Sequence, residues 1–368
     1  MKKILIVSLR SGQGHLMAAK AIEQEFNLTH PQIEVKNIDF LDYATILSKE
    51  FYGKWYLDVV NAVPKFYGWL YENIDPSSSD IRLFFDRINA QDFQTFLFDY
   101  DPDLVIATHF VPGNIATFWK TKYQKRYKTA MIVTDYEAHN LWSDKLIDRY
   151  FVPTKEVSNE LSGMAIEENK IFPTGIPIDR KFSKKYKIRK IRRKLGVDNN
   201  FTVLVTSGGC GVGDIKKIID LIQDIPGKIN ILAMTGHNKE LFTRISNIPS
   251  KVGKNKMVFP FVDNAEELMS VADIIIGKPG GLTVSEALAL GRPIIIINPI
   301  PGQEDANANF LTRNLAGLQA DDIKELGKII LTLIDKPRLI KQLKENAKKI
   351  SKSKAASLIV EKAIELIQ

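Results

Sequence analysis

The sequence has one cysteine, no long apolar run and no metal-binding pattern. Cys210 is the single cysteine among 368 residues, which excludes an intrachain disulfide framework and a zinc site built on several cysteines. No stretch reaches the roughly 18 consecutive apolar residues that a membrane-spanning helix needs. The five histidines are His15, His30, His109, His139 and His237. They show neither the HExxH spacing nor close pairing along the chain, so no metal site is predicted.

Motifs that recognise nucleic acids are also missing, although the chain is basic. Zinc-finger spacing and RNP-like aromatic strands are absent from the sequence. Lys and Arg exceed Asp and Glu by 51 − 43 = 8, and the pI is near 9.2. A basic surface favours anionic partners, and without a nucleic-acid motif a membrane surface or a phosphorylated ligand is the better prediction. A cytoplasmic location is expected from the single cysteine.

The length and the apolar runs predict two α/β domains. A chain of 368 residues is about right for two domains. Runs rich in Ile and Val, such as "KKILIVSL" and "DLVIATHF", alternate with helical patterns, and the series restarts after Gly196 with "FTVLVTSGG" and "ADIIIGKPGG". Such runs without polar alternation are typical of parallel sheets covered on both faces. Two series predict two Rossmann-like domains.

The predicted boundaries follow from composition. We expect an N-terminal domain (1–180), a basic linker (181–197) and a C-terminal domain (198–354). An amphipathic C-terminal helix (355–368) is expected to pack back on the first domain. The run "RKFSKKYKIRKIRRK" (180–194) holds ten basic residues and no acidic one. It is either a solvated helix or linker face, or a contact with anionic lipid.

Residues 43–71 interrupt the α/β pattern. This segment holds nine aromatic residues interleaved with lysines. Aromatic and basic side chains together suit the interfacial zone of a membrane. A packed helical insertion with its own aromatic core is the alternative.

The first glycine-rich loop, "SLRSGQGH", follows the first strand and opens a helix. Gly12 and Gly14 lack the third glycine of the dinucleotide fingerprint. His15 is expected in the first helical turn, where the helix dipole favours a neutral imidazole. A neutral imidazole at a ligand site can act as a general base, although a lone histidine there is also compatible with a purely structural role.

Two further glycine-rich loops follow strands of the second domain. "TSGGCGVGD" (206–214) is either a tight turn or a loop whose N–H groups approach an anion. In "GKPGGLTVSEALALG" (277–291), Thr283 and Glu286 form a capping box, with Thr283 at the N-cap, and Gly291 ends the helix. The capping box does not explain Gly280 and Gly281, whereas a pyrophosphate on the helix N-terminus does.

The next strand leads into "NPIPGQEDANANF". Gln303 and Glu304 are expected on a loop at the same sheet edge, where an amide and a carboxylate can bind vicinal sugar hydroxyls. The start of another helix is the alternative, because Glu304 and Asp305 favour a first turn.

These motifs resemble glycosyltransferase family 28. "GKPGGLTVSEALALGRPIIIINPIPGQEDANANFL" is similar to the donor-binding region of the processive diacylglycerol glucosyltransferases and the monogalactosyldiacylglycerol synthases, and more distantly to the N-acetylglucosaminyltransferase of peptidoglycan precursor synthesis. "SGQGH", "VTDYEAHNLW", "FPTGIPID" and "TSGGCGVGD" resemble other motifs of this family. The resemblance implies the GT-B fold, in which two Rossmann-like domains face each other across a cleft.

The resemblance also implies an inverting, metal-independent transfer of a hexose. The donor would be UDP-glucose or UDP-galactose, the acceptor diacylglycerol or a glycosyl-diacylglycerol, and no other cofactor is expected. The enzyme would lie on the inner face of the cell membrane, held by 43–71 and, as a second candidate contact, by 180–194. The carried-over catalytic candidates are His15, Asp135 and His109, and those for donor binding are Gly208, Gly209, Phe261, Gly280, Gly281, Leu282, Thr283, Glu286, Gln303 and Glu304.

Three alternatives stay open at this point. A UDP-sugar 2-epimerase would share the architecture and act on a soluble substrate alone. A non-catalytic protein would bind the UDP-sugar or the membrane. Nucleic-acid binding through 180–194 would give steep salt-dependent affinity.

Overall fold

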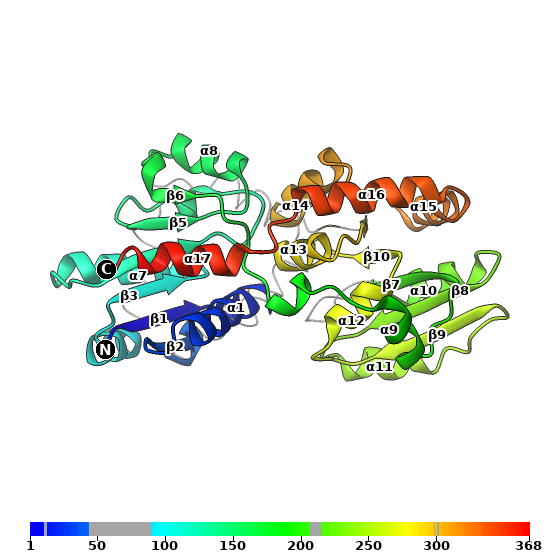
Figure 1. The fold of residues 1–368 in the computed structure, drawn as a ribbon, viewed down its shortest axis with the longest axis horizontal. Coiled ribbons are helices and arrows are strands. Elements are labelled where there is room, and N and C mark those ends of the chain that lie inside the picture. Colours follow the sequence, from blue (N-terminus) through cyan, green and yellow to red (C-terminus); the bar gives the residue numbers. More distant parts are fainter. Residues whose placement is uncertain (11–12, 44–89, 207–214, 298, 300–301) are drawn as a thin grey trace. The chain divides into compact units, whose positions relative to one another are not determined.

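The computed structural model describes residues 1–10, 13–43, 90–206, 215–297, 299 and 302–368. This part of the chain divides into two compact units. The first comprises Met1–Arg180, Pro301–Gln303 and Lys354–Gln368, and the second comprises Lys181–Ile300 and Glu304–Ser353. Each is built on a parallel sheet with helices on both faces, so the prediction of two Rossmann-like α/β domains is confirmed (Figure 1).

The first sheet has the strand order β2-β1-β3-β4-β5-β6. All its described pairings are parallel. The chain leaves β1 toward β2 on one side, and β3 lies on the other side, which makes the β1/β3 junction the topological switch point. The strands are β1 (Lys3–Ser8), β2 (Glu34–Asp39), β3 (Leu104–Ala107), β4 (Lys128–Ile132), β5 (Arg149–Phe151) and β6 (Ile171–Phe172).

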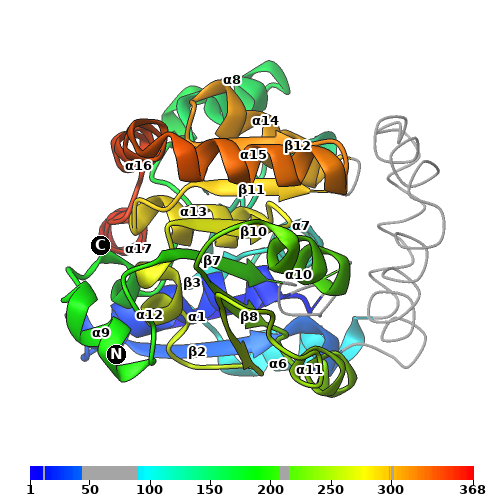
Figure 2. The same cartoon turned by 90° about the vertical axis from the view of Figure 1, so that its right-hand side faces the viewer.

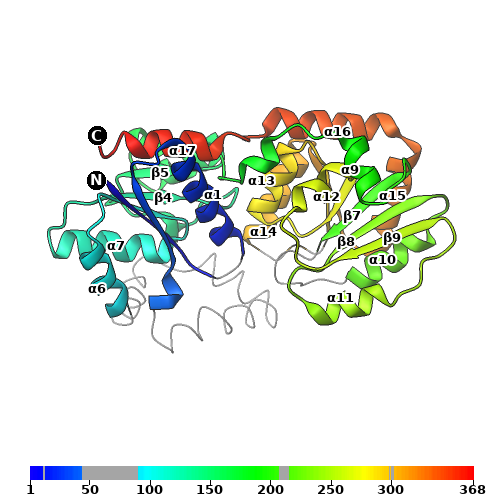
Figure 3. The same ribbon diagram turned by 60° about the horizontal axis from the view of Figure 1, so that its bottom comes forward.

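Alternating residues of β1 pack against different helices. Leu5 and Val7 share a core with the residues of α6 and α7. Ile4 and Ile6 share another core with residues of α1 and α17, the last two lying next to each other (Figures 1 and 3). Both faces of this strand are therefore buried, which explains its unbroken apolar sequence. The helices are α1 (Gln13–Thr29), α6 (Gln91–Tyr100), α7 (Phe110–Lys122), α8 (Lys155–Gly163) and α17 (Ala355–Ile364), with short 3-10 turns η1 (Phe40–Tyr43), η4 (Asn140–Trp142), η5 (Glu168–Lys170) and η6 (Arg180–Ser183).

The second sheet has the order β12-β11-β10-β7-β8-β9, and Figure 2 shows β11, β10, β7 and β8 in this sequence from top to bottom. Counted from β7, this is the 3-2-1-4-5-6 order of the dinucleotide-binding fold, with the switch point between β7 and β10. The strands are β7 (Phe201–Thr206), β8 (Ile229–Met234), β9 (Lys254–Phe259), β10 (Ile274–Gly277), β11 (Ile294–Ile297) and β12 (Gly317–Ala320).

Helices cover both faces of this sheet as well. Figure 3 shows α10 and α11 on one side of β7, β8 and β9, and α9 and α12 on the other. The core joins Val203 and Val205 of β7 to Ile219 of α10 and Ile330 of α15. The helices are α9 (Ile188–Lys194), α10 (Ile215–Asp224), α11 (Lys239–Ser246), α12 (Ala265–Val271), α13 (Gly281–Ala289), α14 (Gln303–Arg313), α15 (Ile323–Asp335) and α16 (Pro337–Ile350).

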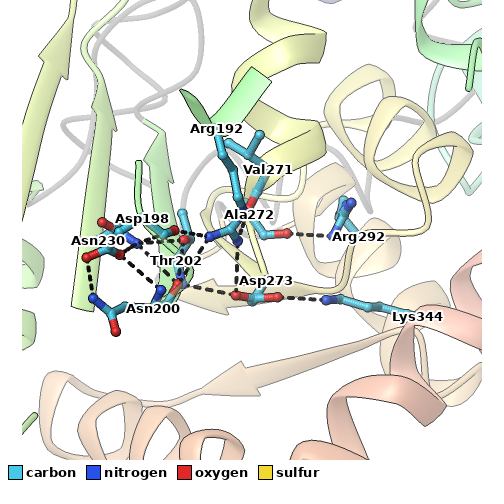
Figure 4. A network of polar contacts seen from close by, with 10 residues as sticks. All are labelled: Arg192, Asp198, Asn200, Thr202, Asn230, Val271, Ala272, Asp273, Arg292 and Lys344. Carbon is cyan, nitrogen blue, oxygen red and sulfur yellow. Dashed lines mark hydrogen bonds and ion pairs between the residues drawn. The ribbon is translucent and has the colours of Figure 1, made fainter. Parts of the chain in front are cut away.

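The basic run 180–194 is partly engaged in the second unit. Arg192 of α9 donates hydrogen bonds to the backbone oxygens of Asn200 and Val271 and lies 3.7 Å from the Asp273 carboxylate. The Nζ of Lys344 lies 2.9 Å from the other carboxylate oxygen of Asp273, and Figure 4 shows these groups converging. This network lies where β7 and β10 begin, at the opposite edge from the expected ligand site. The side chain of Arg192 therefore contacts residues at this edge of the sheet rather than facing solvent.

Two predicted features lie outside the described residues. These are the aromatic segment 43–71, except for its first residue, and the glycine pair Gly208 and Gly209. Tyr43, the first residue of that segment, is described and packs against the rings of Phe93 and Phe96.

Candidate functional site

The first unit brings its three candidate catalytic residues to one sheet edge. His15 lies in the first turn of α1, after β1, and His109 is the N-cap of α7, directly after β3. Asp135 follows β4. Because β1, β3 and β4 are neighbours in a parallel sheet, their carboxyl ends meet at the same edge. The rings of His15 and His109 have centroids 4.8 Å apart in an edge-to-face arrangement.

The hydrogen bonds of His15 define its tautomer. Its Nδ1 lies 2.7 Å from the backbone oxygen of Thr108 and 3.0 Å from the Oγ1 of Thr134. A carbonyl oxygen can only accept a hydrogen bond, so Nδ1 carries the proton. The neutral ring therefore has its lone pair on Nε2, which is the atom that can act as a base.

The backbone around His15 is also held in place. The Oγ1 of Thr108 donates a hydrogen bond of 3.1 Å to the backbone oxygen of His15. Thr108 and Thr134 are both buried. These threonines were not among the predicted site residues, and their positions just beyond the ends of β3 and β4 could have revealed them.

His109 has the opposite tautomer. Its Nδ1 accepts a hydrogen bond of 3.2 Å from the backbone N–H of Val111, as an N-cap residue does. The proton of the neutral ring is therefore on Nε2. The two neighbouring rings thus combine a potential proton acceptor, Nε2 of His15, with a potential donor, Nε2–H of His109.

The electrostatic surroundings keep His15 neutral. Burial lowers the pKa of the His15 imidazole below its ordinary value of 6.5, and the nearby negative charge of Asp135 and the hydrogen bond with Thr108 oppose this shift without cancelling it. A neutral imidazole at neutral pH can accept a proton. The arrangement is chemically suited to general-base catalysis.

The second unit presents the N-terminus of α13 at its switch point. The helix begins at Gly281, and its N-cap is Gly280, which has no side chain that could cap it. The prediction that Thr283 is the N-cap of a capping box with Glu286 is wrong, because Thr283 already lies in the first helical turn. Helix geometry leaves the first N–H groups without intrahelical partners, so they can bind an anion. The prediction that Gly291 ends this helix is confirmed by its positive φ of 62°.

The glycines around this turn have different roles. A Cβ on Gly277, the last residue of β10, would lie 2.8 Å from the Cγ2 of Thr206 and 2.8 Å from its backbone oxygen. This glycine therefore permits close packing of β10 against β7. A Cβ on Gly280 would meet nothing within 4 Å. Among the described residues, the space beside Gly280 at the start of this helix is open.

The remaining donor-site candidates lie on neighbouring connections of the second unit. Leu282 and Glu286 are partly buried in α13. Gln303 and Glu304 begin α14, so their prediction as loop residues is wrong and the alternative of a helix start is correct. Their roles in sugar binding stay predictions.

Phe261 lies two residues beyond β9 and is 46% exposed. Its ring stacks on that of His237, which follows β8, with centroids 4.2 Å apart and 14° between the planes. The loops are joined, because the N–H and the Oγ1 of Thr235 both donate to the backbone oxygen of Phe259. His237 was not among the predicted site residues, and its place after β8 was the signal that could have found it.

Comparison with known proteins matches each half of the chain to a family. Residues 15–178 match the model of monogalactosyldiacylglycerol (MGDG) synthase, and residues 202–362 match that of the glycosyltransferase family 28 C-terminal domain. The chain belongs to glycosyltransferase family 28. The recognition based on the sequence motifs is therefore confirmed. His15 and His109 of the first unit and the α13 turn of the second lie within the matched ranges of this glycosyltransferase.

Individual proteins agree with this assignment. The glycosyltransferase is 26% identical over 365 residues to a Bacillus subtilis protein named processive diacylglycerol beta-glucosyltransferase, covering 98% of this chain and 94% of the relative. Its structure resembles Acinetobacter baumannii MurG, with a TM-score of 0.66, 14% identity and coverage of 99% and 100%. It also resembles the UDP-GlcNAc 2-epimerase from Neisseria meningitidis, with a TM-score of 0.62, 16% identity and coverage of 99% and 100%. These likenesses establish the GT-B fold.

Within the described ranges, no helix is both long and apolar enough to cross a membrane. In the same part of the chain, no three or more His, Cys, Asp or Glu side chains are grouped so that they could hold a metal ion.

Proposed function

We propose that this glycosyltransferase transfers glucose or galactose from a UDP-sugar to diacylglycerol or to a glycosyl-diacylglycerol. The observation that carries the proposal is the full-length similarity to the protein named processive diacylglycerol beta-glucosyltransferase. The match of residues 15–178 to the MGDG synthase model supports a lipid acceptor at the first unit, since this range lies within that unit.

The second unit would hold the donor and stabilise its leaving group. The uncapped N–H groups at Gly281, Leu282 and Thr283 would bind the diphosphate, and the α13 dipole would favour the charge that develops there. This electrostatic role would make a metal ion unnecessary. The resemblance further suggests ribose binding by Glu286, uracil beside Phe261, and contacts from Gln303 and Glu304 to the sugar hydroxyls, with Gly208 and Gly209 completing the site.

The first unit would activate the acceptor. Nε2 of His15 would take the proton of the acceptor hydroxyl while its oxygen attacks the anomeric carbon. Attack from the side opposite the departing UDP would invert the configuration at that carbon. The Asp135 carboxylate would stabilise the imidazolium that forms, and the Nε2–H of His109 would orient the acceptor.

Membrane attachment would bring the lipid within reach. The aromatic and basic composition of 43–71 suits the interfacial zone, and exposed cations of 180–194 would add attraction to anionic lipid. The enzyme would then act as a peripheral protein on the cytoplasmic face of the membrane.

The direct test is UDP release by the purified protein. We expect release from UDP-glucose or UDP-galactose only when diacylglycerol is present in mixed anionic micelles, and the preferred donor names the sugar. Donor conversion without lipid would instead favour a UDP-sugar 2-epimerase. Binding of UDP-sugar without turnover, lipid present, would favour a non-catalytic protein.

Metal independence has its own test. With excess EDTA, the lipid-dependent rate should stay within about twofold of the untreated rate, because helix N–H groups and not a cation would hold the diphosphate. A matched sample treated with EDTA and then excess Mg²⁺ controls for chelator effects. Loss of the rate in EDTA, restored by Mg²⁺, would refute the metal-free mechanism.

A further inference from the structure

The side chain of Thr134 lies where it can influence proton transfer at His15. Thr134 is the second residue after β4 and is only 5% exposed. Its position is fixed by its neighbour Val133, whose N–H bonds to the backbone oxygen of Phe151. The hydroxyl lies 3.0 Å from Nδ1 of His15, and Nδ1 also contacts the Thr108 carbonyl oxygen. Nδ1–H thus faces two oxygen acceptors at once.

The second acceptor matters most when the ring is charged. In the neutral ring the Thr108 carbonyl alone is sufficient to hold the Nδ1 proton. When Nε2 gains a proton, the positive charge spreads over the ring, and hydrogen bonds from a charged donor are roughly twice as strong as neutral ones. An oxygen lone pair aimed at Nδ1–H therefore stabilises the imidazolium more than the imidazole.

Charged and titratable neighbours contribute to the same balance. In the part of the chain that is described, Asp135 from the loop after β4 and His109 from the N-cap of α7 face His15. Asp135 acts on His15 through its charge, and it directly follows Thr134 in the sequence. The end of β4 thus supplies both a dipole and a charge to one imidazole.

We propose that Thr134 is a positioning residue of the transfer reaction: its Oγ1 accepts the Nδ1–H bond of His15 and so stabilises the imidazolium formed when Nε2 receives the acceptor proton. The inference rests on the proposed role of His15. In this step the O–H bond of the acceptor breaks and the N–H bond at Nε2 forms. The acceptor oxygen bonds to the anomeric carbon, and the bond from that carbon to the diphosphate breaks, with its electron pair leaving on UDP.

Three variants separate the hydroxyl from the packing of Thr134. Thr134→Val keeps the shape and removes the hydroxyl. Thr134→Ala and Thr134→Ser both remove the methyl group and differ only in the hydroxyl, so they remain informative if the valine variant is unstable. The assay is lipid-dependent UDP release as a function of pH, with donor KM and melting temperature measured alongside.

We expect Thr134→Val to have a kcat about tenfold below that of the wild type, with donor KM unchanged. We expect the same difference between Thr134→Ala and Thr134→Ser. The acid limb of the kcat profile should move to lower pH, because a less stabilised imidazolium forms only at higher proton concentration. Thr134→Ser should restore both. Equal rates and equal acid limbs in the Ala and Ser variants would overturn the inference.

The outcome for His15→Ala distinguishes this inference from the function on which it rests. If His15→Ala is inactive while the three Thr134 variants match the wild type, only the role of Thr134 fails. If His15→Ala remains active, the role of His15 as the base fails, and the role of Thr134 fails with it.

Discussion

At the scale of single residues, backbone contacts determine which nitrogen of each histidine carries the proton. The carbonyl of Thr108 places it on Nδ1 of His15, and the N–H of Val111 places it on Nε2 of His109. The sequence pattern points to His15, and the family resemblance adds Asp135 and His109, each of which follows an apolar strand. It could not predict the tautomer of His15, since this depends on a contact with Thr108, 93 positions away, and no side-chain pattern encodes a contact with a carbonyl oxygen.

The pH dependence of the wild-type rate tests the state of His15. Its neutral form would be the active one, and burial lowers its pKa below 6.5. Because the charged form then predominates only at pH below this lowered pKa, kcat should stay level as the pH falls to 6.5 and decline only at more acidic pH. Measuring kcat from about pH 5 to 8 would reveal this decline on the acid side. An acid limb centred above 6.5 would contradict a neutral, buried base.

At the scale of elements, most of the fold follows from the apolar runs. The strands predicted from the runs "KKILIVSL", "DLVIATHF", "FTVLVTSGG" and "ADIIIGKPGG" are confirmed as β1, β3, β7 and β10. Two strands were not predicted: β6, which has two residues, and β12, whose sequence "GLQA" has little apolar character. These strands form by pairing with a neighbour at a sheet edge rather than by their own propensity. The start of α13 was misplaced because a glycine can begin a helix without a capping side chain.

The two glycines on either side of "KP" offer a matched pair of variants. Gly280→Ala should leave the melting temperature unchanged, because its Cβ would stand in open space at a φ of −59°, and should weaken UDP-sugar binding by about tenfold by crowding the helix N-terminus. Gly277→Ala should cost about 1–3 kcal/mol of stability, because its Cβ would collide with Thr206. Thermal unfolding and donor titration check both. Gly280→Ala with wild-type donor affinity would argue against diphosphate at this helix.

At the scale of the whole molecule, and apart from Pro301–Gln303, the chain passes from the first unit to the second after Arg180 and returns after Ser353. The buried carboxylate of Glu25, in α1, binds both passages on the side of the first unit. Its Oε1 lies 2.6 Å from Nη2 of Arg180 and 2.6 Å from Oγ of Ser357. These contacts could not be predicted from the sequence, because the partners of Glu25 are 155 and 332 positions away.

Glu25→Gln tests how firmly these passages are held. Burial raises the Glu25 pKa. The hydrogen bonds from Arg180 and Ser357 and the charge of Arg180 lower it by a larger amount, so the pKa lies below its ordinary value of 4.5. The stabilisation is therefore complete above 4.5 and is lost as the pH falls through the lowered pKa. We expect the variant to lose about 2 kcal/mol of unfolding free energy near neutral pH and the difference from wild type to shrink in acid.

The control for this variant is Glu167→Gln. Glu167 forms an ion pair of 2.9 Å with Lys170, and its side chain is 64% exposed, so its loss should change stability little. Denaturant unfolding at neutral and acidic pH compares the variants. A Glu25→Gln protein as stable as the Glu167→Gln protein at neutral pH would show that the contacts of Glu25 contribute nothing.

The central claim is that His15 takes the acceptor proton during sugar transfer to a lipid, and the rate of lipid-dependent UDP release by His15→Ala tests it most directly. His30→Ala is the matched control, because His30 directly follows the same helix and its Nδ1 contacts only the neighbouring Thr29 hydroxyl among the hydrogen bonds described. We expect kcat of His15→Ala to fall by about 100-fold or more with donor KM nearly unchanged, and His30→Ala to match the wild type. Activity of His15→Ala within about threefold of the wild type would show that His15 is not the base.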